Sequence, residues 1–250
     1  MIKIVVQFNI SADILTPFAV YDIINENLWN GDEMIKLLIF DLDGTLSDTL
    51  PSIRHAINLA AKQVGYPERT YDEVRAAIGD GARVLMKRVM PPERARDERA
   101  VDEHLSLYEE MYDKTYMEAD TLYDGMADAL DGLYERGYAI AVLSNKQDNY
   151  VKLIVEQIVK EGIVSLAMGQ QEGYPTKPDP SVPLMIAERF GVLPSEVAFI
   201  GDSEVDVMTA KNAGMMSVGC DWGYRGREVL ECHGADHVIS RPEELLEIFL

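Results

Sequence analysis

The stretch LLIFDLDGTLSDT at residues 37–49 decides how the whole chain is interpreted. Apolar residues lead directly into Asp41 and Asp43, which are separated by one leucine and followed by a glycine. A short, uninterrupted apolar run predicts a strand that is buried on both faces of a parallel sheet. In open α/β sheets, ligands bind beyond the carboxyl ends of such strands. The two aspartates are therefore the first candidates for a functional site.

The spacing of Asp41 and Asp43 has a physical consequence. Residues two apart in an extended segment point the same way, so the two carboxylates are predicted to project together. Their mutual repulsion then needs compensation, and Mg²⁺ is a hard cation that prefers oxygen ligands. A carboxylate can also act as a nucleophile toward phosphorus while a neighbouring carboxylate exchanges protons. Gly44 permits a sharp turn directly after the pair.

Apolar runs recur along the rest of the chain and alternate with helical patterns. The segments 138–145, 196–202 and 215–220 are predicted strands, and amphipathic stretches lie between them. Strands separated by helices imply right-handed crossovers and a parallel sheet. The predicted fold class is therefore α/β, with a three-layer Rossmann-like core.

Residues 50–120 interrupt this alternation, because they have only helical patterns, including a long charged helix at about 93–118. Such a block after the first strand predicts an all-helical cap inserted into the core. The predicted division is an N-terminal extension at 1–33, a core domain formed by 34–49 and 121–250, and a cap domain at 50–120.

The extension at 1–33 has a weak and mixed pattern, whereas Met34 opens a segment that resembles a natural protein start. Residues 31–33 are Gly-Asp-Glu, whose codons are rich in purines and are compatible with a ribosome-binding site. We hypothesise that Met34 is the initiator. The alternative is a genuine N-terminal arm.

Polar residues follow the later predicted strands at the same edge of the sheet. Ser144 and Asn145 follow one strand, Lys177 lies in a loop, and Asp202 and Asp206 follow a third strand. Lys177 would offset charge on a phosphoryl group, Ser144 would donate a hydrogen bond, and Asp202 would add a ligand to the ion. Asp206 shares a helical face with Asp202 and would support the ion through its neighbours. Each motif alone is also compatible with a turn, a helix cap or a surface loop; their combination favours a functional site.

These motifs together resemble the haloacid dehalogenase superfamily of phosphohydrolases. DLDGT at 41–45, LSN at 143–145, the lysine of KPDP and GDSEVD at 201–206 are similar to its four motifs. The resemblance implies that Asp41 is the nucleophile and Asp43 the general acid and base. It also implies that Asp41, Asp202 and the backbone carbonyl of Asp43 bind Mg²⁺. An aspartate at position 43 favours a phosphatase or a phosphomutase over a dehalogenase.

Within this superfamily, the segment at 78–90 is similar to the cap of phosphoglycolate phosphatases, and the segment at 221–245 to their C-terminal part. The sequence TLYDG departs from the PYPG that these enzymes usually carry. The expected substrate is a small phosphorylated metabolite. Arg83, Lys87 and Arg88 are candidates for holding its carboxylate, although an ordinary cationic helix face gives the same pattern.

Composition limits the partners of the protein. The 250 residues contain 23 Lys and Arg but 43 Asp and Glu, giving a net charge of −20. Such a surface repels nucleic acid and anionic lipid, and no apolar run is long enough to span a membrane. Two cysteines, Cys220 and Cys232, without a secretion signal favour free thiols in the cytoplasm. The oligomeric state is left open.

Other functions are compatible with the same motifs. The phosphoryl-binding residues do not distinguish phosphoglycolate from a sugar phosphate or pyrophosphate, nor hydrolysis from intramolecular transfer in a phosphomutase. A non-catalytic binding protein on this fold is a further alternative. Such a protein is expected to have lost at least one of Asp41, Asp43, Lys177 and Asp202, and all of these are present.

Overall fold

The structure is a computed structural model, and it describes residues 34–116 and 121–250. The predicted extension at 1–33 lies outside the described residues, so its origin stays a prediction. Residues Ile35–Leu250 form one compact unit.

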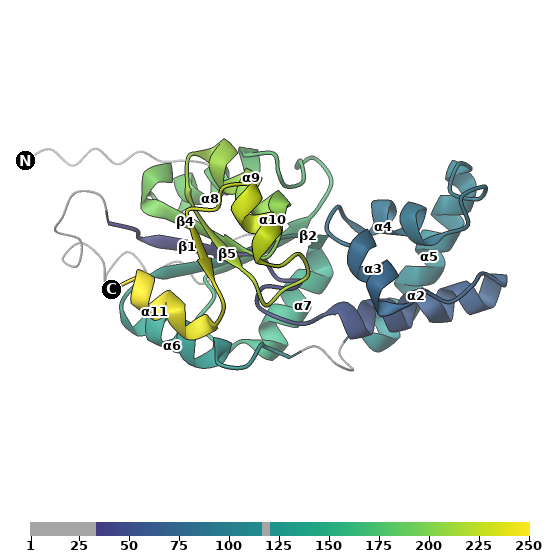
Figure 1. Cartoon of the computed structure of the whole chain (residues 1–250), viewed down its shortest axis with the longest axis horizontal. Coiled ribbons are helices and arrows are strands. Elements are labelled where there is room, and N and C mark those ends of the chain that lie inside the picture. The colour runs from purple at the N-terminus through teal and green to yellow at the C-terminus, as the bar shows by residue number, and fades with distance from the viewer. Residues whose placement is uncertain (1–33, 117–120) are drawn as a thin grey trace, which may run out of the picture. The chain divides into compact units, whose positions relative to one another are not determined.

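A parallel sheet forms the centre of this unit (Figure 1). Its strand order is β3-β2-β1-β4-β5-β6, and β1 (Leu37–Phe40) pairs with β2 on one side and β4 on the other. All residues of β1 are buried, as the uninterrupted apolar run predicts. The other strands are β2 (Ala139–Gln147), β3 (Leu166–Gln170), β4 (Val197–Gly201), β5 (Met216–Cys220) and β6 (His237–Ile239).

Helices cover both faces of the sheet, which confirms the α/β class with a three-layer Rossmann-like core. Figure 1 shows α8, α9 and α10 on one side of the sheet and α6, α7 and α11 on the other. Two short 3₁₀ turns occupy Pro194–Glu196 and Pro242–Glu244. The helices are α6 (Met126–Glu135), α7 (Asp148–Ile158), α8 (Ser181–Arg189), α9 (Glu204–Ala213), α10 (Arg227–Cys232) and α11 (Leu245–Ile248).

A helical cap is inserted between β1 and β2, as the sequence predicts. Its helices are α2 (Leu50–Val64), α3 (Tyr71–Ala77), α4 (Ala82–Val89) and α5 (Glu98–Thr115). Buried residues of α2 and α5, such as Ile57 and Tyr108, belong to one hydrophobic core. This packing follows from the apolar stripe that each helix carries at helical spacing. The exact boundaries at 49/50 and 120/121 between core and cap stay a prediction.

Local capping explains two differences from the predicted elements in the cap. Helix α3 was not predicted from the sequence; its N-cap Thr70 forms a capping box with Glu73. The helix predicted at about 93–118 begins later, at Glu98, because the Asp97 side chain accepts the backbone N–H of Arg99 at 3.1 Å. Short capping motifs therefore set the helix boundaries here.

The strand order places the carboxyl ends of β1, β2 and β4 at one point. After β1, the chain adds β2 and β3 on one side of it, then crosses back to add β4 on the other. Such a reversal leaves a crevice at the ends of the central strands. In the described part of the chain, no helix is both long and apolar enough to cross a membrane.

Candidate active site

A cavity lies at this point, between the ends of the central strands and the cap. Its empty volume is about 730 Å³, part of which is open to solvent. Ile53, Ile78 and Leu85 of the cap supply an apolar wall, and charged side chains of the core supply the floor. The lining includes the predicted site residues Asp41, Asp43, Ser144, Asn145, Lys177 and Asp202.

Lys177 lies between two carboxylates at the floor of the cavity. Its Nζ is 2.9 Å from Asp41 Oδ1 and 2.6 Å from Asp206 Oδ1, and all three residues are buried. Burial opposes the charge of Lys177, but Asp206 and Asp41 together raise the pKa of its ammonium above the ordinary value. The lysine is therefore a permanent cation at the end of β1.

The pKa of Asp41 is raised to about 7. Burial is the largest cause, Asp206 and Asp43 add repulsion, and Lys177 acts in the opposite direction. Burial, followed by repulsion from Asp206 and Asp41, also raises the pKa of Asp202 well above its ordinary range. Carboxylate oxygens of Asp41, Asp202 and Asp206 lie within 4.8 Å of one another. One ammonium does not balance this cluster, which is the environment in which a divalent cation is stabilised.

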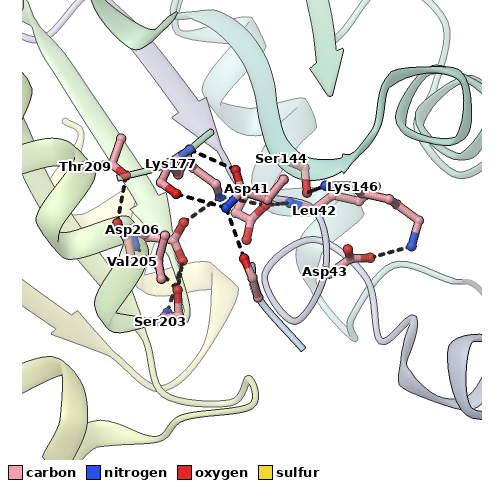
Figure 2. Close-up of polar contacts among 12 residues, drawn as sticks. Asp41, Leu42, Asp43, Ser144, Lys146, Lys177, Ser203, Val205, Asp206 and Thr209 are labelled. Carbon is pink, nitrogen blue, oxygen red and sulfur yellow. Dashed lines mark hydrogen bonds and ion pairs between the residues drawn. The ribbon is translucent and has the colours of Figure 1, made fainter. Parts of the chain in front are cut away.

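Asp206 has both carboxylate oxygens occupied by protein groups. Oδ1 pairs with Lys177, and Oδ2 accepts hydrogen bonds from the Ser203 backbone N–H at 3.1 Å and the Ser203 hydroxyl at 2.6 Å (Figure 2). Ser203 is the N-cap of α9, so the capping box that starts this helix also fixes Asp206. Asp206 thus contacts Lys177 directly, and its indirect role at an ion stays a prediction.

Asp43 faces a different lysine from Asp41. Its Oδ1 lies 2.9 Å from Lys146 Nζ and accepts a hydrogen bond from the Thr49 hydroxyl at 2.5 Å. Figure 2 shows Asp41 directed toward Lys177 and Asp43 directed toward Lys146. Both carboxylates line the same cavity, although each faces its own lysine. The chain turns over residues 42–46, where the backbone N–H of Leu46 donates to the carbonyl of Leu42.

Ser144 and Asn145, the SN pair near the end of β2, make different contacts. The Asn145 side chain accepts the Lys177 backbone N–H at 2.8 Å and donates to the Lys177 carbonyl at 3.1 Å. It also donates to the Gly79 carbonyl of the cap at 3.0 Å. Asn145 therefore positions the lysine loop. Ser144 lines the cavity, and its hydroxyl accepts the Lys146 backbone N–H at 3.3 Å.

Position 44 requires a glycine because the side chains of Asp202 and Tyr224 lie very close to its backbone. Gly44 has a φ of +84°, and a Cβ there would lie 2.6 Å from Asp202 Oδ2 and 2.8 Å from the Tyr224 ring. The backbone N–H of Tyr224 also donates to Asp202 Oδ2 at 2.6 Å. A glycine thus allows the first turn of the site to pack directly against Asp202.

The structure does not bring Arg83 and Arg88 into the cavity. The Arg83 guanidinium pairs with Glu98 at 2.6 Å and with Asp102, while Arg88 pairs with Asp80 at 2.5 Å. Their side chains are 44% and 42% exposed. Lys87 pairs with Glu98 as well. These residues form the ordinary charged helix face that the sequence analysis gives as the alternative.

Lys146, Tyr224 and Arg225 are among the cavity residues that were not predicted from the sequence. Lys146 directly follows the SN pair, so its position at a strand end was an available signal. Tyr224 and Arg225 lie in the loop after β5, between glycines, at the same edge of the sheet. Arg225 donates to the carbonyls of Arg75 and Ile78 in the cap at 2.7 and 2.6 Å.

Comparisons with known proteins identify the family of the chain. The model of the haloacid dehalogenase-like hydrolase family matches residues 38–220, and the chain belongs to this family. A phosphoglycolate phosphatase of Vibrio cholerae is 33% identical over 222 residues, covering 86% of this chain and 97% of the relative. The phosphoglycolate phosphatase of Escherichia coli is 30% identical over 237 residues, covering 87% and 93%.

Solved structures show the same relationship. The crystal structure of a predicted phosphoglycolate phosphatase from Haemophilus somnus superimposes with a TM-score of 0.81 at 29% identity, covering 88% of this chain and 100% of that one. The protein is accordingly a phosphatase of this family, a hydrolase that acts on phosphate esters and is similar to phosphoglycolate phosphatases.

Gly44→Ala is expected to abolish most phosphatase activity, because the added methyl group would displace Asp202. Gly65→Ala is the matched control, since Gly65 also has a positive φ, of 72°, but nothing lies within 4 Å of its Cβ position. Both variants should lose about 1–2 kcal/mol of stability from the left-handed alanine. Only Gly44→Ala should lose activity beyond about tenfold, measured by phosphate release. Equal activity in the two variants would contradict the close-approach argument.

Proposed function

We propose that the protein is a Mg²⁺-dependent phosphoglycolate phosphatase that works through an aspartyl-phosphate on Asp41. The observation that carries this proposal is the buried Asp41 at the end of β1, held 2.9 Å from the ammonium of Lys177 and surrounded by further carboxylates. A lysine beside a nucleophilic carboxylate offsets the negative charge that repels a phosphate ester. The curated relatives support phosphoglycolate as the substrate.

The residues present fit a magnesium ion. Asp41 and Asp202 supply hard oxygen donors, and the backbone carbonyl of Asp43 is the third group that we propose. Asp206 contributes negative charge nearby while its oxygens stay with Lys177 and Ser203. When bound, the ion would neutralise the carboxylates and the phosphoryl oxygens, which stabilises the charge that develops in phosphoryl transfer.

Side chains of the protein can then carry out the reaction in two steps, the formation and the hydrolysis of the aspartyl-phosphate. Asp41 attacks phosphorus, the P–O bond to the leaving group breaks, and Asp43 gives a proton to the departing oxygen. Asp43 next removes a proton from water, which attacks the aspartyl-phosphate and releases inorganic phosphate and free Asp41. Lys177 and the Ser144 hydroxyl stabilise the phosphoryl oxygens. The proposed cap, at residues 50–120, covers the reaction and excludes bulk water.

Substrate preference tests the proposed activity directly. Among phosphoglycolate, a hexose phosphate, glycerol phosphate and pyrophosphate, phosphoglycolate should have the highest kcat/KM in the presence of Mg²⁺. Phosphate release at several concentrations of each ester gives the ranking. A hexose phosphate at the top would contradict the substrate, and conversion to an isomer without phosphate release would indicate a mutase.

Asp41→Asn is expected to lower kcat for phosphoglycolate at least about 10³-fold, because an amide cannot form the acyl phosphate. Since the pKa of Asp41 is raised in the folded state, its ionised form destabilises the metal-free protein as the pH rises through about 7. The variant should therefore be no less stable than the wild type at pH 8 without metal. Asp131→Asn, an exposed carboxylate paired with Lys160, is the control. Turnover retained by Asp41→Asn would refute the nucleophile.

Removal of Mg²⁺ is expected to abolish hydrolysis, and its return should restore it. Binding that relieves carboxylate repulsion should also raise Tm. Mg²⁺ at about 100 times its Kd contributes about 2.7 kcal/mol, and each kcal/mol corresponds to about 2–4 °C at this chain length. Asp202→Asn should lose this shift, whereas Asp131→Asn should keep it. An equal shift in Asp202→Asn and the wild type would exclude Asp202 as a ligand.

A further inference from the structure

The cavity contains few cations, and their present partners differ. Among the described residues that line it, the cationic side chains are Lys146, Lys177 and Arg225. Lys177 is shared by Asp41 and Asp206. Arg225 is held by two cap carbonyls and by Glu204 at 3.4 Å. Lys177 thus serves the phosphoryl end of the cavity, and Arg225 joins the core to the cap.

Lys146 occupies a third position, beside the proposed proton donor. Its side chain is only 7% exposed, and its Nζ is 2.9 Å from Asp43 Oδ1. The same ammonium lies 4.8 Å from the centre of the Tyr112 ring, which belongs to the cap helix α5. Lys146 therefore extends from the end of β2 toward the cap, with its charge between Asp43 and an aromatic wall.

The leaving group of the substrate must come to this place. In the proposed reaction Asp43 protonates the oxygen that bridges phosphorus and the leaving group, so the leaving group lies beside Asp43. In phosphoglycolate, one methylene separates that oxygen from the carboxylate. The substrate's carboxylate would therefore lie near the Asp43 side chain. The Lys146 ammonium already contacts Asp43, so it is within reach of that carboxylate.

We infer that Lys146 is the residue that selects the substrate's leaving group, by binding a carboxylate carried one carbon away from the ester oxygen. The inference rests on the proposed function, and it assigns to Lys146 the task that the sequence analysis gave to Arg83, Lys87 and Arg88. A buried cation gains most from an anion in a site of low dielectric constant, whereas an exposed arginine outside the cavity gains little. In the structure, this ammonium contacts Asp43 Oδ1.

The experiment compares phosphoglycolate with 2-hydroxyethyl phosphate, which replaces the carboxylate with a neutral CH₂OH group. The readout is the ratio of their kcat/KM values in wild type, Lys146→Met and Lys146→Arg. Lys146→Met will slow both esters, because Asp43 loses a contact. It should also lower the ratio about tenfold to a hundredfold, mainly through the KM of phosphoglycolate. Lys146→Arg should retain most of the preference.

Lys152→Met is the matched control, since Lys152 is 57% exposed and pairs with Asp148 outside the cavity. Its ratio should equal that of the wild type. A wild-type preference that survives in Lys146→Met would overturn the inference and leave the proposed function intact. An equal loss for both esters would show that Lys146 only positions Asp43, which also overturns it. A wild type without any preference for the carboxylate ester would contradict the proposed substrate itself.

Discussion

The ammonium of Lys177 between the carboxylates of Asp41 and Asp206 is the interaction on which the site depends. Buried ions are costly unless their geometry is good and their remaining hydrogen bonds are satisfied. Here Asn145 fixes the lysine backbone, and Ser203 fixes the second oxygen of Asp206. Each partner follows a different strand, so the convergence of the parallel strand ends allows the pair to form. The charge cluster therefore depends on the fold, which brings its three members together.

Negative charge remains in excess around Lys177 and its two carboxylate partners. Among residues 34–116 and 121–250, no lysine forms an ion pair with Asp202. Its Oδ2 accepts the Tyr224 backbone N–H, and its pKa stays raised. Protein groups alone thus raise the pKa of both Asp41 and Asp202, whereas a bound dication would favour their ionised forms. The overall charge of −20 does not explain this excess, because the local field depends on groups within a few ångströms. The same local reasoning lets an acidic protein bind an anionic ester.

The sequence predicted those parts of the site that depend on local rules. A buried apolar run followed by polar residues identifies a strand end, and parallel topology brings such ends together, which is why Asp41, Ser144 and Asp202 line one cavity. The sequence did not predict the contacts of a side chain whose partner is distant along the chain. Asp41 faces Lys177 and Asp43 faces Lys146, and both lysines are far from the aspartates in the sequence, so no local pattern shows which lysine each carboxylate contacts.

Contacts with residues distant in the sequence also determine where the cationic side chains lie. Arg83 directly follows Ala82, which lines the cavity, yet its guanidinium turns to Glu98 and Asp102 because α5 packs against α4. Arg225 is far away in sequence, yet it reaches the cap carbonyls. Charge pattern on a single helix shows which face is polar but does not show what that face meets, so the roles of individual cations needed the structure.

The start of the cap helix α2 shows how closely the cap is joined to the charged centre. Thr49 is its N-cap, but the threonine hydroxyl donates to Asp43 and does not cap the helix. The Tyr224 hydroxyl oxygen instead accepts the backbone N–H groups of Thr49 and Leu50, both at 3.1 Å. Because the backbone of Tyr224 also holds Asp202, a displacement of this helix end would disturb Asp43 and Asp202 together. The position of the cap and the arrangement of the reacting carboxylates are thus mechanically linked through two side chains, which explains why residues outside the motifs are part of the site.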